Sequence, residues 1–427
     1  MIFSIKYSLK IYISLKLYLR FIMSYSKEEV IEFIRQEDVR FIRLAFCDFL
    51  GNLKNLAIIP DQLNKAFEEG ISFDGSAITG FATPDRSDLF LVPIPSTLTV
   101  LPWRSTTGKV VRMFCEIRNS DGTPFERDSR YILYKAVEEA KANGITVKMG
   151  SECEFYLFQN DERGNPTKIP FDNAGYLDVA PLDKGENIRR EICLTLKEMD
   201  IHPEASHHEE GPGQNEIDIR RASPMKSADN IINLKSVVQT CAVRNGLTAD
   251  FSPKPLSGKS GNGFHISVSV ESDNGKDVMP NFLAGVLNHM EEMTAFLNPV
   301  YNSYERLGAD KAPKYIGWGR QNRTQLIRVP AVCGSEEKRF EVRSPDPMTN
   351  PYIAYSLIIL AGLDGIKNNM LLPSPEDVNL YTAPLEITSK LKKLPETLSS
   401  AIDKAKDSDF IKQSLPESLI NCLTSSF

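Results

Sequence analysis

Three features are scarce in this sequence: a basic excess, paired cysteines and long apolar runs. The 427 residues carry 50 lysines and arginines against 56 aspartates and glutamates, a formal net charge of -6, so no surplus of positive charge is available to neutralise a nucleic-acid backbone. The seven cysteines are scattered and none forms a CxxC pair, which is typical of reduced thiols in a cytosolic protein. We therefore expect a cytoplasmic protein with no nucleic-acid partner, in which local arginine clusters bind small anions.

Residues 1–22 follow a strict period of two. Odd positions from Ile5 to Phe21 are apolar or aromatic, while the lysines, the serines and the arginine of this stretch occupy even positions. The longest uncharged stretch there is too short for a signal-peptide core or a membrane span, so we expect no membrane partner. Because Met23 precedes a regular domain opening, we interpret residues 1–22 as an atypical extension translated from an upstream start. A basic strand or an interfacial segment is the alternative.

The chain also lacks internal repeats and low-complexity segments, and its length allows two or three domains. Residues 23–120 predict a small α+β domain that opens with a capping box, Ser26 with Glu29, at the start of a helix. The polar run 118–130 marks its end, so residues 121–427 are predicted to form a second domain. The further elements of the first domain are a hairpin over 39–46 and 53–59, a helix over 61–69, and strands over 89–92 and 110–117.

The second domain is predicted to alternate strands with longer helices. The helical segments are 131–143, 186–199, 226–245, 352–366 and 388–411.

Four strand-like segments carry ionisable side chains where strands are usually apolar. Residues two apart on a strand face the same side, so Glu152 and Glu154 project together, opposite Cys153 and Phe155. The same pattern recurs in three later segments, 215–220, 263–270 and 339–343. Their polar faces consist of Glu216 and Asp218; of His265, Ser267 and Ser269; and of Arg339, Glu341 and Arg343.

Two interpretations of these faces are open at this point. Each could be the solvated side of a half-exposed antiparallel strand. If the four faces converge, however, their carboxylates repel one another strongly in a low dielectric, and a bound cation relieves the repulsion. Oxygen ligands with one imidazole suit Mg²⁺ or Mn²⁺ better than a structural zinc, and arginines beside them indicate phosphate.

Three further residues are ambiguous when taken singly. His207 and His208 stand beside Glu209 and could be metal ligands, although loop histidines are more often solvated. Asp74, in Phe73-Asp74-Gly75-Ser76, reads as an ordinary turn aspartate.

Taken together, the motifs resemble bacterial type I glutamine synthetase over nearly the whole chain, from Met23 to about residue 420. The resemblance implies an α+β protein. Its N-terminal β-grasp domain would be followed by a glutamine synthetase/guanido kinase-like catalytic domain, whose antiparallel sheet forms a funnel between ATP and glutamate. The signatures, in order, are Phe73-Asp74-Gly75-Ser76, Glu152-Cys153-Glu154-Phe155, His207-His208-Glu209 through Gly213-Gln214-Asn215-Glu216, Pro253-Lys254-Pro255 through Gly263-Phe264-His265, Asn322-Arg323-Thr324 through Arg328-Val329-Pro330, and Arg339-Phe340-Glu341-Val342-Arg343-Ser344-Pro345-Asp346.

The resemblance also implies two or more bound Mg²⁺ or Mn²⁺ ions. By analogy, one ion would be held by Glu154, Glu209 and Glu216, and the second by Glu152, His265 and Glu341.

The remaining roles are implied in the same way. Arg306, Arg343 and Gly261 resemble residues that contact glutamate, and Ser269 one that lies near the nucleotide. The arginines Arg323, Arg328 and Arg339 resemble those around the transferring phosphoryl group, Arg339 on the nucleotide side. Asp74, reaching in from a neighbouring subunit, resembles an ammonium-binding acid, so we expect a homo-oligomer with active sites between subunits.

The implied reaction is the ATP-dependent ligation of ammonia to the γ-carboxylate of L-glutamate, through γ-glutamyl phosphate. The metal ions and arginines would offset charge on two anions that repel each other, and closure of the site would keep water from the acyl phosphate. Two alternatives stay open: a γ-glutamyl ligase that uses an organic amine, and a non-catalytic homologue that binds glutamate or nucleotide and acts through partners.

The sequence departs from the family pattern in three places, and the first, in the flap, motivates the organic-amine alternative. The flap, usually Arg-Leu-Val-Pro-Gly-Tyr-Glu-Ala-Pro, reads Arg306-Leu307-Gly308-Ala309-Asp310-Lys311-Ala312-Pro313, one residue shorter, with Lys311 in place of the catalytic glutamate. A cation cannot accept a proton from ammonium, so Asp310 would have to turn inward to replace that acid. Ser260 replaces a glutamate-contacting asparagine. The chain ends at Phe427, short of the usual C-terminal tail, which makes a hexamer as well as a dodecamer an expected assembly.

One further tyrosine matches a regulatory position. Tyr381, in Asn379-Leu380-Tyr381, resembles the tyrosine that some family members adenylylate, but we predict no modification of it.

Overall fold

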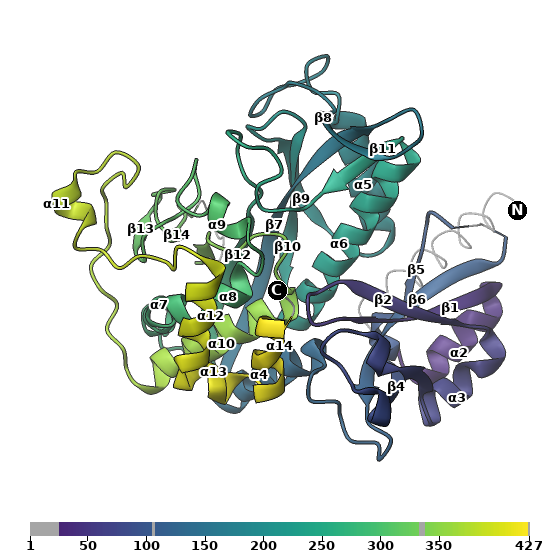
Figure 1. The fold of residues 1–427 in the computed structure, drawn as a ribbon. Helices are drawn as coiled ribbons and strands as arrows, with labels where there is room; N and C mark the ends of the chain where they lie inside the picture. Colours follow the sequence, from purple (N-terminus) through teal and green to yellow (C-terminus); the bar gives the residue numbers. More distant parts are fainter. Residues whose placement is uncertain (1–24, 105–106, 333–337, 426–427) are drawn as a thin grey trace, which may run out of the picture.

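The structure is a computed structural model that describes residues 25–104, 107–332 and 338–425, with side chains described as far as Cys422. The predictions for residues 1–22 lie outside the described residues. Within the described part, an N-terminal sheet and a larger C-terminal sheet lie in two adjoining parts of the molecule (Figure 1).

The N-terminal sheet has the strand order β2-β1-β6-β4-β3, with β5 paired to β6. β1 and β6 run parallel, and the other pairs are antiparallel, including the predicted hairpin β1–β2. Two helices, α2 (Lys27–Gln36) and α3 (Leu63–Glu68), complete this part. The strands are β1 (Val39–Cys47), β2 (Leu53–Ile58), β3 (Ile71–Asp74), β4 (Asp88–Pro93), β5 (Thr99–Val100) and β6 (Lys109–Arg118).

The predicted capping box at the start of α2 is confirmed. The Ser26 amide donates to Glu29 Oε2 at 2.7 Å, and the Glu29 amide donates to Ser26 Oγ at 3.2 Å. These two bonds satisfy amides that the first helical turn leaves unpaired, and the helix then buries Val30 and Ile34 against the sheet.

The C-terminal sheet has the strand order β13-β14-β15-β12-β7-β10-β9, with β8 and β11 also paired to β7. All of its pairs are antiparallel except β13–β14. The long strand β7, of 16 residues, lies inside the sheet between β12 and β10 (Figure 1). The strands are β7 (Ile145–Asn160), β8 (Pro166–Pro170), β9 (Pro203–His208), β10 (Gln214–Ala222), β11 (Leu247–Asp250), β12 (Phe264–Ser272), β13 (Trp318–Arg320), β14 (Ile327–Val329) and β15 (Phe340–Val342).

The four predicted strands with ionisable faces are neighbours in this sheet, as β15-β12-β7-β10. Their register aligns Glu152 with His265 on one side and with Asp218 on the other, and aligns Glu154 with Glu216. Because antiparallel partners in register project to the same side, the ionisable faces converge. The interpretation as separate solvated faces is therefore wrong.

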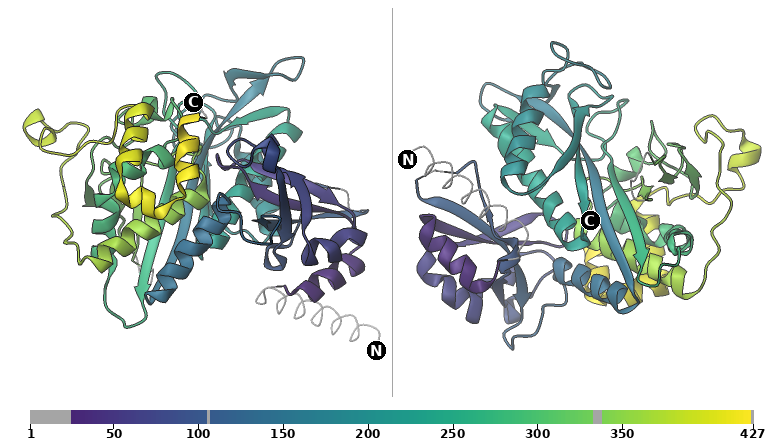
Figure 2. Two further views of the ribbon diagram at one scale, coloured as in Figure 1. Left: turned by 60° about the horizontal axis from the view of Figure 1, so that its bottom comes forward. Right: turned by 180° about the vertical axis from the view of Figure 1, so that it is seen from behind.

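The opposite, apolar face of the sheet packs on helices. Cys153, Ile217 and Ile266 belong to one large buried cluster that also holds residues of α4, α6 and α10. Figure 2 shows these helices from two further sides. The helices are α4 (Ser129–Ala142), α5 (Glu186–Glu198), α6 (Pro224–Arg244), α7 (Met279–Asn288), α8 (Met290–Leu297), α9 (Ser303–Arg306), α10 (Pro351–Lys367), α11 (Leu385–Thr388), α12 (Leu398–Asp407), α13 (Asp409–Ser414) and α14 (Glu417–Ser425).

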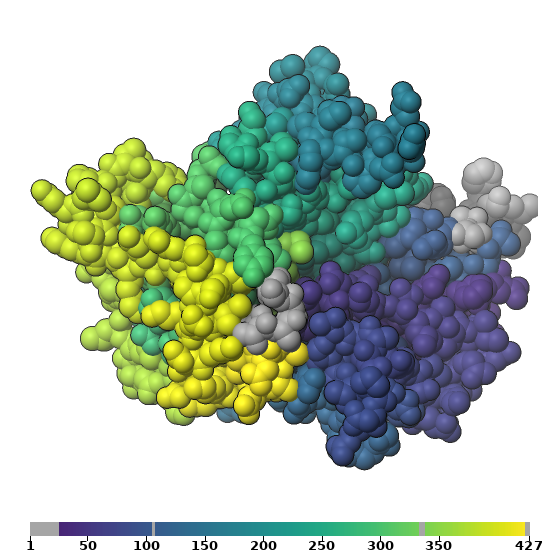
Figure 3. Space-filling model, viewed as in Figure 1, coloured from purple at the N-terminus to yellow at the C-terminus, as the bar shows by residue number. Residues whose placement is uncertain are grey.

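The turn between β1 and β2 joins the two parts of the molecule. Asn350, the N-cap of α10, donates through Nδ2 to the carbonyl of Phe49 at 3.1 Å. Gly51 has a φ of +80°, and a Cβ there would lie 2.9 Å from the Asn350 Cα, so this contact requires glycine. In the space-filling view, the N-terminal part lies on one side of the molecule and the yellow C-terminal segment lies beside it (Figure 3).

One predicted helix starts too early. The charged segment 388–411 was predicted to be helical throughout, whereas α12 begins only at Leu398. Pro395 interrupts the segment, the Ile316 amide donates to the Lys392 carbonyl, and Thr397 with Ser400 caps the new helix. No helix in the described ranges combines the length and apolar character that a membrane crossing requires.

A buried ion pair holds α4 to α6. Arg130 donates to both oxygens of Asp229, at 3.1 and 3.0 Å, and the Tyr352 hydroxyl of α10 donates to the same carboxylate at 2.6 Å. We predict that Arg130→Leu lowers the free energy of unfolding by about 3–5 kcal/mol, because it leaves a buried carboxylate without its counter-charge. Urea unfolding measures this loss.

The matched control is Arg35→Leu, which removes an exposed ion pair with Glu32 on α2 and should cost under about 1 kcal/mol. Equal losses in the two variants would contradict the prediction.

Candidate active site

The converging faces line one cavity of about 270 Å³. Among the predicted site residues, those that line it are Glu152, Glu154, Glu209, Glu216, Gly261, His265, Arg306, Arg323 and Arg343. The sheet supplies most of its acids, and the loops that follow β9, β11 and α9 close over them. Two other hollows of about 480 Å³ each carry no comparable group of acids.

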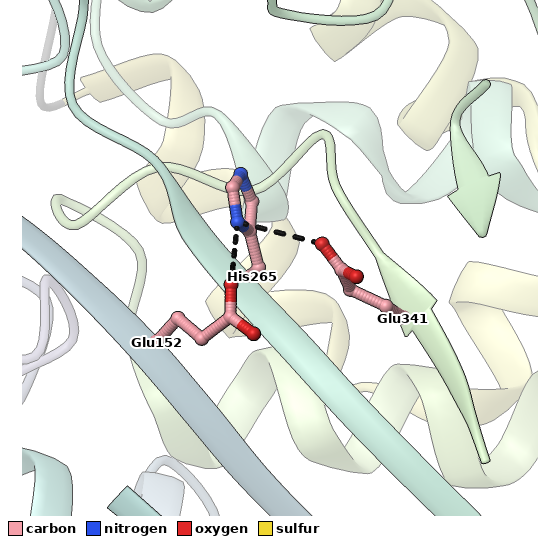
Figure 4. Close-up of side chains that lie close together, drawn as sticks. All are labelled: Glu152, His265 and Glu341. Atoms are coloured by element: carbon pink, nitrogen blue, oxygen red, sulfur yellow. Dashed lines mark hydrogen bonds and ion pairs between the residues drawn. The ribbon is translucent and has the colours of Figure 1, made fainter. Parts of the chain in front are cut away.

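The first group of possible metal ligands is Glu152, His265 and Glu341, from three adjacent strands (Figure 4). The His265 Nδ1 lies 3.0 Å from Glu152 Oε2 and 3.5 Å from Glu341 Oε1. This set of three ligands was predicted from sequence, and the structure brings all three together.

The second group consists of His207, Glu209 and Glu216. The His207 ring nitrogens lie 3.6 Å from Glu209 Oε1 and 3.6 Å from Glu216 Oε1. Glu154, the third predicted ligand here, lines the same cavity and accepts a hydrogen bond from Gln214 at 2.8 Å. His207, an ambiguous candidate from sequence, therefore lies with the acids.

His208 has a different place. Only 1% of its surface is exposed, its Nε2 lies 2.8 Å from Asp172 Oδ1, and its Nδ1 lies 2.6 Å from the Glu209 carbonyl. Asp172 also accepts from the Gly213 amide at 2.9 Å. The expectation of a solvated loop histidine is wrong: His208 fixes the loop that carries Glu209.

Clustering raises the pKa of several carboxyls. Burial and the neighbouring Glu154 raise the pKa of Glu209 to about 7. Burial, Glu154 and Glu152 hold the pKa of Glu216 well above its usual range, and burial with Glu152 raises the pKa of Asp218 to about 6. These carboxyls therefore lack enough positive charge around them for all to ionise easily.

Two arginines offset the negative charge of Glu341. Burial alone would raise the pKa of Glu341, but Arg343, His265 and Arg328 outweigh it and lower the pKa to about 2. Arg343 and Arg328 donate to the two Glu341 oxygens at 2.6 and 2.7 Å. Arginine charge is thus placed directly on Glu341, whereas Glu209, Glu216 and Asp218 keep a raised pKa and are left for a bound cation.

The donor set fits divalent metal ions. It consists of carboxylate oxygens with imidazole nitrogens, and Asp218 Oδ1 is buried without a hydrogen-bond partner among the described residues. Asp218 belongs to a further group of close acids with Glu152 and Glu216. Its place on the polar face of β10 was visible in the strand period, although we did not predict it as a ligand.

Arg306 lines the cavity next to Arg343. Its guanidinium donates to the carbonyls of Ser344 at 2.7 Å and Arg343 at 3.2 Å, and only 3% of its surface is exposed. A Cβ on Gly261 would lie 2.5 Å from the Pro253 carbonyl and 2.9 Å from Arg306 Cγ. Glycine is therefore required for the loop to approach Arg306 this closely.

Comparison with known proteins places these features in a family. Residues 126–425 match the family model of the glutamine synthetase catalytic domain, and residues 38–120 match that of the glutamine synthetase beta-grasp domain. The chain belongs to the glutamine synthetase family. The resemblance found in the sequence and the β-grasp and catalytic-domain fold class are both confirmed.

Individual members of the glutamine synthetase family match over most of their length. A glutamine synthetase of Clostridium saccharobutylicum is 43% identical over 92% of this chain and 91% of its own. One of Methanosarcina mazei is also 43% identical, over 92% and 91%. Among solved structures, a GmaS/ADP complex has a TM-score of 0.84 at 26% identity, covering 94% of this chain and 95% of its own.

Glu341 and Arg328 are also absent from the lining, but Glu341 pairs with Arg328 and with Arg343, which lines the cavity. Three other predicted residues of the glutamine synthetase pattern lie outside the lining. Asp74 is exposed at the end of β3, where its carboxylate accepts from the Ser76 amide and hydroxyl at 2.9 and 2.6 Å. Ser269 is buried on β12, and Arg339 immediately precedes β15. Within one chain these residues do not reach the cavity, and their predicted roles stay predictions.

The flap, defined as residues 306–313, contributes no uncompensated acid. Asp310 lines the cavity, but Lys254 lies 2.5 Å from its carboxylate. Lys311 is paired with Glu210, and the Ser260 hydroxyl lies 3.5 Å from Glu210 Oε2. Sequence reasoning missed the roles of Glu210 and Lys254, because only the folded loops bring them to the flap.

We predict that metal binding strengthens with rising pH. Protons compete with the metal on carboxyls whose pKa is raised, such as Glu209, so Mn²⁺ should bind more weakly at pH 6 than at pH 8. With one competing proton and a pKa of about 7, the affinity should rise about tenfold in total between pH 6 and pH 8. Calorimetric titration of the metal-free protein with Mn²⁺ at both pH values measures it.

Glu209→Gln should reduce this pH dependence, whereas Glu271→Gln, on the same sheet at a surface ion pair with Lys148, should leave it unchanged. Affinity that is independent of pH in the parent protein would contradict the prediction.

Proposed function

We propose that this protein is an ATP-dependent glutamate-ammonia ligase that forms glutamine, ADP and phosphate. The observation that carries the proposal is its 43% identity over 92% of the chain to a protein named glutamine synthetase, with acids and arginines gathered in one cavity. The other family members named here carry the same name or, for the solved structure, hold ADP.

In this proposal, the two groups of acids would hold Mg²⁺ or Mn²⁺. Glu152, His265 and Glu341 would bind one ion, and Glu154, Glu209 and Glu216 the other, with His207 beside them. When bound, such ions neutralise phosphate oxygens and stabilise charge that develops during phosphoryl transfer.

The arginines would position the two anionic substrates. Arg306 and Arg343 are two of the cations that line the cavity, and they would bind the glutamate carboxylates. Arg323, which also lines the cavity, would approach the phosphoryl group. Arg328, which is bonded to Glu341, and Arg339 would act around the same group in the assembled enzyme. The γ-carboxylate oxygen would attack the γ-phosphorus in line, and ADP would leave.

The second half-reaction needs an amine that has lost its proton. The nitrogen would attack the acyl carbon, the bond to the phosphate oxygen would break, and phosphate would leave with the electron pair. The nitrogen would then release one further proton to phosphate or water, which leaves the neutral amide. Asp74 would bind the ammonium ion from a neighbouring copy of the chain, because within its own chain it lies outside the cavity. We therefore propose a homo-oligomer whose active sites are shared between copies of the chain. We also propose that it acts in the cytoplasm.

We predict glutamate-dependent phosphate release from ATP that requires Mg²⁺ and ammonium and yields glutamine. A parallel panel of organic amines identifies the nucleophile. Release with an organic amine but not with ammonium would overturn the choice of substrate, and no glutamate-dependent release would overturn the proposed function.

Glu152→Gln keeps the shape of the side chain but removes a metal-binding charge, and it should lower this activity at least about a hundredfold. Glu271→Gln is its control on the same sheet and should stay within about twofold, since a surface ion pair contributes little.

A shared site predicts complementation between two inactive variants. Asp74→Asn and Glu152→Gln should each be nearly inactive alone, whereas co-expressed mixtures should regain up to about a quarter of parental activity, because some interfaces then combine two intact halves. Activity assays of the purified mixture measure this. A mixture no better than either variant would contradict a site shared between copies.

A further inference from the structure

The flap is tied to three separate loops. The Asp310 carboxylate pairs with Lys254 of the loop after β11, and the Lys311 ammonium pairs with Glu210 of the loop after β9. From a third direction, the Tyr381 hydroxyl donates to the Lys311 carbonyl at 2.6 Å. Lys311 is therefore held both by its side chain and by its backbone.

The Lys311–Glu210 pair lies on the solvent-exposed side of the cavity lining. Both residues line the cavity, and their side chains are 61% and 34% exposed. The Lys311 Nζ also lies 5.8 Å from the centre of the Tyr176 ring, within the range of a cation–π contact. Tyr176 precedes the turn at Leu177, whose amide donates to the His208 carbonyl, so this ring belongs to the same wall as Glu210.

The chemistry of the pair excludes an acid–base role for the lysine. A protonated lysine cannot accept a proton from an amine, and it stands where the family pattern has glutamate. An isolated lysine at this place would repel an incoming ammonium ion. Glu210 removes that repulsion by neutralising the charge of Lys311. The same pair fastens the flap to the loop that follows β9.

We propose that Lys311 and Glu210 form an ion-pair latch that positions the flap over the cavity in place of the usual flap acid. Its consequence for turnover rests on the proposed function, because the flap would shield the acyl phosphate. In an open site, a water oxygen adds to the acyl carbon, the bond to the phosphate oxygen breaks, and glutamate, phosphate and a proton result. ATP is then consumed without amide formation.

The test uses charge reversal on the full-length protein. Lys311→Glu and Glu210→Lys each place two like charges together, whereas the double variant restores an opposite pair with the positions exchanged. Lys226→Glu is the matched control, because Lys226 of α6 forms an exposed ion pair with Asp200. Hydrogen exchange of the amides of residues 307–312 reports on the flap without requiring activity.

Each single variant should exchange its flap amides at least about threefold faster than the parent, and the double variant should return to within about twofold. The ratio of amide product to ADP should fall in both single variants and recover in the double variant. Lys226→Glu should change neither quantity.

Two outcomes would overturn the latch: unchanged flap exchange in the single variants, or no recovery in the double variant. Faster amide formation by Lys311→Glu alone would also overturn it, since the flap would then lack an acid rather than need a latch. If flap exchange behaves as expected but no variant, nor the parent, shows glutamate-dependent ADP formation, the latch stands and the proposed function fails.

Discussion

Repulsion among buried carboxylates is the constraint on which the rest of this structure depends. Glu152, Glu154 and Glu216 project into one cavity from adjacent strands, and the pKa of Glu216 is raised well above its usual range because burial and neighbouring acids oppose its charge. A fold that gathers such groups loses stability unless positive charge is brought to them. The two arginines on Glu341 supply it to that acid, and the acids whose pKa stays raised are suited to bind divalent cations.

The other features of the fold hold this arrangement in place. The apolar face of the same strands packs on α4, α6 and α10, and the buried Arg130–Asp229 pair joins two of these helices. Asp172 and His208 fix the loop of Glu209, and backbone carbonyls fix Arg306 beside Arg343. Rigid acids and arginines in one cavity are what phosphoryl transfer between two anions requires.

Sequence periodicity was sufficient to identify four strands with one ionisable face, because side-chain alternation is a local property of a strand. The assignment of metal ligands on those faces came from the family resemblance. It could not supply the register that aligns Glu154 with Glu216, nor the burial of His208, which depends on Asp172 36 residues away. The Lys311–Glu210 pair joins residues 101 positions apart and was invisible for the same reason. The prediction of a helix over 388–411 was wrong at its start, because Pro395 and the cap at Thr397 delay α12 to Leu398 despite the local charge pattern. The predicted role of Asp74 in ammonium binding stays a prediction, because it depends on a neighbouring copy of the chain.

The most direct test of this account is anomalous diffraction at the manganese edge from crystals grown with Mn²⁺ and ADP. The account predicts two peaks in the cavity. One should lie within about 2.5 Å of ligand atoms of Glu152, His265 and Glu341, and the other within the same distance of Glu154, Glu209 and Glu216. An absence of peaks in the cavity, or peaks that touch neither set of ligands, would contradict the claim that bound cations compensate these acids.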